Sequence, residues 1–141
     1  MLLRSTWTLD STTLGTQTIT ASAGTGVTVD FTATALAAAP DAITAEDGDA
    51  QTGTVGEPLT TDLQVLVKDT YGNVVEGATV TFTGDGTAAD AVTDVNGLAS
   101  STWTLDSTTL GTQTITASAG TGVTVDFTAR SEEHTSELQS H

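Results

Sequence analysis

Short segments in which apolar and polar residues alternate follow one another along most of the chain, separated by turn residues. In "DLQVLVKD", for example, Leu63, Val65 and Val67 fall on one face of an extended segment, while Gln64 and Lys68 fall on the other. This period of two predicts an all-β protein, with about seven short strands in one packed unit and no convincing helix. The expected core consists of Leu63, Val65, Val67, Val80, Phe82, Trp103, Leu105, Ile115, Val125 and Phe127.

The alternating pattern is itself repeated, because the 29 residues from 5 to 33 recur without a substitution at 101–129. Their spacing of 96 residues has the size of one immunoglobulin-like β-sandwich and exceeds the period of about 20–50 residues found in solenoids. We therefore expect tandem immunoglobulin-like β-sandwiches, in which residues 34–129 form one complete unit with 34–40 as its linker. Residues 1–33 are then the truncated last three strands of a preceding unit.

The two copies of the repeated segment are expected to compete for the same partner strands. The second copy follows Asn96-Gly97, a dipeptide that is the strongest short signal for a β-hairpin. Because a short connection costs less closure entropy, we expect the second copy to complete the sandwich and the first copy to be left frayed.

The last twelve residues, "RSEEHTSELQSH" (130–141), break the alternating pattern. They are charged and follow no strand period, and they resemble the conceptual translation of a short sequencing adaptor joined to the end of a DNA fragment. We therefore leave residues 130–141 out of the expected fold as a non-native tail. Both histidines, His134 and His141, lie in this tail, and the chain has no cysteine.

The charge of the chain excludes several classes of partner. It has 18 acidic residues against three Lys or Arg, a formal net charge of −15. Such a surface repels phosphate backbones, so we expect no nucleic-acid partner. No apolar run approaches the roughly 18 residues of a membrane-spanning helix. The lack of cysteine removes disulfides, thiolate catalysis and most structural zinc sites.

The residues outside the tail also lack the usual groups for catalysis. A Ser or Thr nucleophile needs a base, and Lys68 is more simply a solvated strand lysine, so we expect no enzyme, no catalytic residue and no cofactor. Oxygen ligands leave calcium as the metal to consider, with Glu46, Asp47 and Asp49 as weak candidates and a solvated acidic loop as the alternative. "DVNG" (94–97) resembles the start of an EF-hand loop, but Leu105 stands where that loop requires a bidentate glutamate.

Four separated motifs, in order, carry a family resemblance: "EDGDAQTGTVGEPL", "VKDTYGNVVEGATVTF", "TDVNGLASSTWTL" and "GTQTITASAG" with the following "VDFTA". They resemble the group-1 bacterial immunoglobulin-like repeat of the invasin/intimin type, over residues 34–129 and, as the last third of a unit, over 5–33. The resemblance implies β-sandwiches strung in tandem in the extracellular stalk of a bacterial surface adhesin. It transfers no binding residues, because such families usually place receptor binding in a separate terminal domain.

The expected function is therefore a noncatalytic spacer repeat that projects a binding domain from the bacterial cell surface, anchored in the outer membrane through other parts. Its partners would be neighbouring immunoglobulin-like repeats, with a host receptor or glycan bound through other domains. The alternative is a carbohydrate- or host-protein-binding module of a secreted protein. An exposed aromatic platform would favour that alternative, and Tyr71 is the one candidate for it.

Overall fold

The computed structural model describes residues 3–133, and this range contains ten strands and no helix, hence none that could cross a membrane. The alternation in sequence appears directly as alternation in burial, most regularly along β5 and β9. The strands are β1 (Gly15–Ser22), β2 (Thr28–Ala35), β3 (Pro40–Asp47), β4 (Gln51–Thr54), β5 (Leu63–Asp69), β6 (Thr79–Gly84), β7 (Ala91–Val92), β8 (Leu98–Ser101), β9 (Gly111–Ser118) and β10 (Thr124–Glu132).

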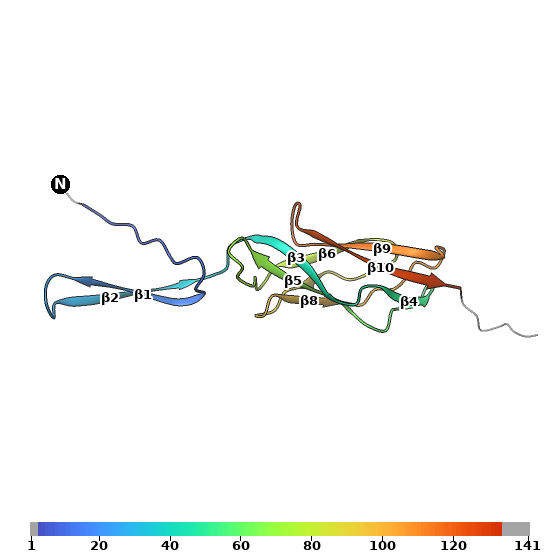
Figure 1. Ribbon diagram of the computed structural model, residues 1–141, viewed down its shortest axis with the longest axis horizontal. Helices are drawn as coiled ribbons and strands as arrows, with labels where there is room; N and C mark the ends of the chain where they lie inside the picture. Colours follow the sequence, from blue (N-terminus) through green and yellow to red (C-terminus); the bar gives the residue numbers. More distant parts are fainter. Residues whose placement is uncertain (1–2, 134–141) are drawn as a thin grey trace, which may run out of the picture.

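Eight of these strands form a β-sandwich, and the first two form a separate hairpin. One sheet of the sandwich has the order β4-β10-β9-β6-β7, and the other has the order β3-β5-β8. All pairings are antiparallel except that of β10 with β4. The hairpin lies beyond one end of the sandwich, and β10 points out of the opposite end (Figure 1).

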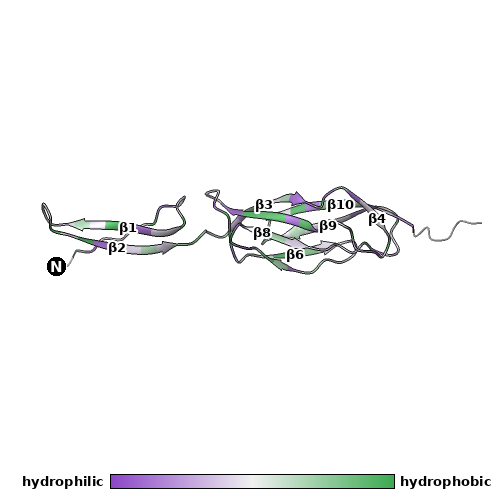
Figure 2. Ribbon diagram, turned by 90° about the horizontal axis from the view of Figure 1, so that it is seen from below, coloured by the Kyte–Doolittle hydropathy of each residue, from purple (hydrophilic) through white to green (hydrophobic). Residues whose placement is uncertain are grey.

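The core lies between the two sheets. Figure 2 shows hydrophobic segments on strands of the hairpin as well as on strands of the sandwich. Of the ten side chains expected in the core, nine are buried, and Trp103 is completely enclosed. The tenth, Val125, is only half-buried, as is Val123, because both lie near the tip of the β9–β10 hairpin. The indole N–H of Trp103 donates to the carbonyl oxygen of Asp85 (2.8 Å), so the one polar atom of this side chain is satisfied.

The Asn96-Gly97 turn does not close a hairpin between paired strands, contrary to the sequence prediction. The chain does reverse tightly there, since Gly97 N–H donates to the Asp94 carbonyl (2.9 Å) and Asp94 N–H donates to the Leu98 carbonyl (2.9 Å). However, β7 before the turn pairs with β6, and β8 after it pairs with β5 in the other sheet. The turn therefore carries the chain from one sheet to the other.

Both ends of the sequence-based division need correction. The first copy contains two strands rather than three, because the strand that precedes β9 in the complete unit, β8 (Leu98–Ser101), ends at the residue where the repeated segment begins. At the other end, β10 continues through Arg130 to Glu132, where it still pairs with β4 and β9. The side chain of Ser131 is buried and donates to the carbonyls of Thr109 and Gly111. These first residues of the supposed tail thus belong to the fold, while residues 134–141 lie outside the described range.

Candidate functional site at the junction of hairpin and sandwich

The most specific polar arrangement in the described chain surrounds the buried carboxylate of Asp69, the last residue of β5. Its Oδ1 accepts the backbone N–H groups of Tyr71 and Asn73, both at 2.9 Å. Its Oδ2 accepts the side-chain amide of Asn73 (3.0 Å) and the backbone N–H of Ala38 (2.9 Å). The first set of bonds shapes the "DTYGN" turn, as aspartate side chains commonly do. The bond from Ala38 ties the linker between hairpin and sandwich to that turn.

These hydrogen bonds decide the charge state of Asp69. Burial alone would raise the pKa of the carboxyl group, because it penalises the ionised form. The donors around it, with the Asn73 side chain first and the three backbone N–H groups after it, outweigh burial and lower the pKa to about 2. Asp69 is therefore a carboxylate at neutral pH, and its role is to hold backbone donors in place.

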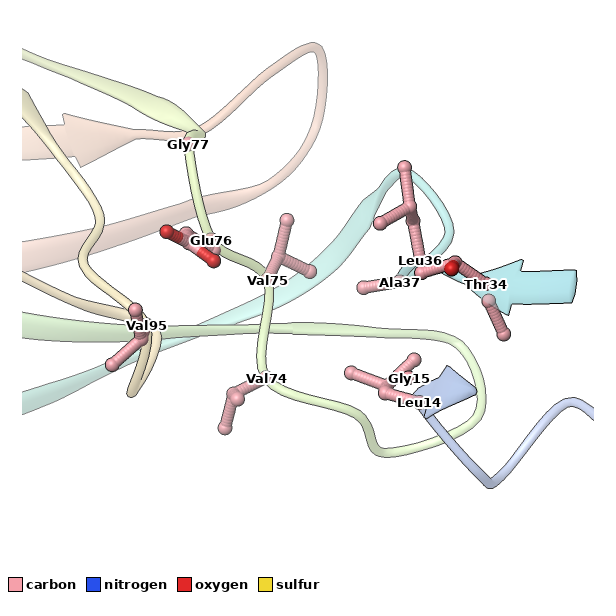
Figure 3. Close-up of a pocket in the computed structure, with 11 residues that line it drawn as sticks. Leu14, Gly15, Thr34, Leu36, Ala37, Val74, Val75, Glu76, Gly77 and Val95 are labelled. Carbon is pink, nitrogen blue, oxygen red and sulfur yellow. The ribbon is translucent and has the colours of Figure 1, made fainter. Parts of the chain in front are cut away.

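The amide of Asn73 extends this contact to the hairpin side, because it also donates to the carbonyl oxygen of Ser11 (2.7 Å). Beside it lies a groove of about 550 Å³ between the two parts of the chain. Figure 3 shows Leu14 and Leu36 on the hairpin side of this groove and Val75 and Val95 on the sandwich side. The junction thus combines an open apolar groove, in which Leu36 and Val95 remain largely exposed, with two side chains that fix the linker and the loop preceding β1.

The pairing of Asp69 with Asn73 was not predicted from the sequence. The turn itself was visible in "DTYGN", but its partners at the junction are distant in sequence. Ala38, whose N–H donates to Asp69, is 31 residues away from it, and Ser11, whose carbonyl oxygen accepts the Asn73 amide, is 62 residues away from Asn73. An aspartate that opens a Gly-Asn turn is the local signal that could have identified the carboxylate as a structural acceptor.

The calcium candidates are placed along one segment but not around a common point. Glu46 accepts the hydroxyl of Thr44 (2.9 Å), and Asp47 accepts the N–H of Gly48 (2.8 Å). Asp49 accepts the N–H of Thr128 (2.9 Å), which links the β3–β4 loop to β10. Within residues 3–133 no group of three or more His, Cys, Asp or Glu side chains is arranged to hold a metal ion.

The remaining candidates from the sequence are Lys68, Tyr71 and the "DVNG" turn, and in the structure none of them forms part of a cluster of reactive groups among the described residues. Lys68 is exposed on β5. Tyr71 is exposed, but it stands beside the loop that precedes β1, next to Ser11 and Leu14, rather than on an open sheet face. The carboxylate of Asp94 accepts the N–H groups of Asn96 and Leu98 (2.8 and 3.1 Å), so "DVNG" is a self-bonded turn. The chemistry that the described residues offer at the junction is hydrogen bonding beside an apolar groove.

Comparison with known proteins supplies no relative for this arrangement. No protein-family model matches the chain, and no curated protein matches it significantly.

Proposed function

We propose that the chain is a noncatalytic structural spacer of a bacterial surface adhesin, built from sandwich units joined end to end. The observation that carries this proposal is the position of the two chain connections. The linker enters the sandwich at β3, at the end that faces the hairpin, and β10 leaves at the opposite end (Figure 1). A unit with this geometry adds its full length to a chain of like units.

The fixed linker supports the same proposal. In a stalk, the joint between units must resist bending, or the length of the array would collapse into a coil. The Asp69–Ala38 and Asn73–Ser11 hydrogen bonds hold the joint on both sides of the linker. The placement on a bacterial cell surface, the neighbouring immunoglobulin-like repeats as partners, and a host receptor or glycan bound elsewhere rest on the sequence resemblance.

The test is the length of engineered arrays with two, four and six copies of residues 34–129, measured by small-angle X-ray scattering. Strands of eight or nine residues plus their loops predict that each added unit contributes roughly 35–40 Å to the maximum dimension. Matched arrays that carry Asp69→Ala in every unit should be less extended, because each linker loses its anchor. An increment far below 35 Å in the unmodified arrays would contradict the proposal. Direct binding of a single unit to glycans or host proteins would favour a binding module instead.

A further inference from the structure

The hairpin formed by β1 and β2 presents an apolar face that nothing in the described chain covers. Ile19 and Phe31 are 45% and 54% exposed, whereas Ile115 and Phe127, their counterparts in the second copy, are 1% and 0% exposed. Beside them lies a hollow of about 450 Å³, lined by Trp7, Ile19 and Phe31 among others. The counterpart Trp103 lies completely inside the core.

The first copy nevertheless already has the conformation that the sandwich uses. Ile19 pairs with Phe31 across the hairpin in the same register as Ile115 with Phe127. The two outer edges of the second copy are occupied, since β9 pairs with β6 and β10 pairs with β4. The corresponding edges of β1 and β2 pair with no third strand among the described residues. The expectation that the first copy is frayed is therefore wrong for β1 and β2, which form a paired hairpin that lacks only its neighbours.

The chain cannot easily supply these neighbours from its own sandwich. If the first copy replaced the second, Ala33 would take the place of Ala129, which lies opposite Gln51 in β4. The six residues between Ala33 and Pro40 would then have to run back to the start of β3, and fully extended they reach at most about 25 Å. The strand β3 alone is about 25 Å long, and β4 lies beyond its far end (Figure 1). The linker is therefore too short for this exchange within one molecule.

We propose that the first copy, residues 5–33, is a docking surface for a polypeptide with the sequence of residues 34–100, which is the part of a like unit that precedes the repeated segment. In the bound state, a strand equivalent to β6 pairs along β1, with Phe82 opposite Ala21 as it is opposite Ala117 in the sandwich. A strand equivalent to β4 pairs along β2, and a carbonyl equivalent to that of Asp85 accepts the indole N–H of Trp7.

We choose this partner because the first copy is identical in sequence to residues 101–129, which pack against residues 34–100 in the sandwich. The core side chains of the second copy pack together with residues of 34–100, and the first copy carries the same side chains 96 residues earlier; these core side chains are Trp103, Leu105, Ile115, Ala117, Phe127 and Ala129. Complementarity of shape, register and hydrogen bonding is therefore observed within the same molecule. The proposed docking depends only on the repeated segment and on the fold of the sandwich. It does not depend on a role of the protein in adhesion.

Titration of the complete chain with a separate polypeptide of residues 34–100 tests the proposal. That polypeptide contains no tryptophan and Trp103 is already buried, so any change in tryptophan emission reports on Trp7. We expect a shift of the emission to shorter wavelength that saturates at one polypeptide per chain. We also expect the amide resonances of residues 5–33 to move toward those of 101–129.

Phe31→Ala is the matched control, because it removes a side chain that is exposed in the free chain and buried in the proposed complex. It should leave the sandwich unchanged and weaken binding by more than about 100-fold. A synthetic peptide of residues 5–33 mixed with 34–100 should also restore a folded sandwich. The proposal is overturned if that mixture does not fold, or if it folds while the complete chain does not bind the 34–100 polypeptide. It is also overturned if Phe31→Ala binds that polypeptide as tightly as the unmodified chain, or if the free chains dimerise through their hairpins instead.

Discussion

The two copies of the repeated segment allow one substitution to be made twice in the same chain, in the same local sequence but different surroundings. Phe127→Ala removes a ring that is completely buried in the core, and Phe31→Ala removes one that is half-exposed on the hairpin. Loss of a buried phenylalanine typically costs about 3–5 kcal/mol, from lost transfer free energy and from the cavity left behind. The exposed ring should change the stability of the sandwich by less than about 0.5 kcal/mol.

Urea denaturation followed by circular dichroism measures this difference. With a slope of about 1–3 kcal/mol per molar urea, a loss of 3 kcal/mol or more lowers the midpoint for Phe127→Ala by at least about 1 M. Because a domain of this size has about 5–15 kcal/mol of total stability, the variant should remain folded without urea in all but the lower part of that range. Phe31→Ala should unfold at the same midpoint as the unmodified chain.

If Phe127→Ala lowers the free energy of unfolding by less than about 1 kcal/mol, the reasoning that only the second copy fills the core is refuted. The intact first copy could replace the altered second copy only if the linker argument were wrong, and such replacement would rescue stability. The double variant with Phe31→Ala and Phe127→Ala separates the two explanations. If it is no less stable than Phe127→Ala alone, the copies do not exchange. Hydrogen exchange in the unmodified chain should agree, with slow exchange in β9 and β10 and fast exchange in β1 and β2.

Three further outcomes are expected. Trp103→Ala should destabilise the sandwich by about 3–5 kcal/mol in the same urea assay, and a loss under 1 kcal/mol would contradict its place at the centre of the core. Asp69→Asn should reduce the melting temperature at pH 5, and the difference from the unmodified chain should shrink as the pH falls from about 4 to 2. The sign follows because the folded pKa of Asp69, about 2, lies below the unfolded value near 3.9, so its stabilisation exists above the unfolded pKa and is lost on protonation. Gly97→Ala should cost more stability than Gly111→Ala, since both glycines have positive φ but only a Cβ at Gly97 would meet Val74 Cβ, at 2.8 Å.

The all-β fold followed from the sequence because side-chain alternation alone distinguishes strands whose one face is buried. Leu63, Val65 and Val67 needed no knowledge of their partners to be placed inside. Which of the two sheets a strand belongs to was harder to predict from the sequence. The turn at Gly97 looks the same in sequence whether the flanking strands pair with each other or separate, and what separates them here is the pairing of β8 with β5. The junction was missed for a related reason, since Asp69 meets Ala38 only after the sandwich has formed.

The repeated segment shows which features are local, because its sequence is constant while its surroundings differ. Gln17 and Gln113 make the same three hydrogen bonds, each to the preceding loop, although only Gln113 is fully buried. In that loop, the pKa values of Asp10 and Asp106 are both lowered, in each case chiefly by the hydroxyl of the threonine three residues later. Loop, turn and register are therefore encoded within the 29 residues, whereas burial of Phe127 is supplied by the rest of the sandwich. A segment that folds locally but lacks its core partners retains the shape needed to bind them, and for this reason the exposed hairpin is a surface to test by adding residues 34–100.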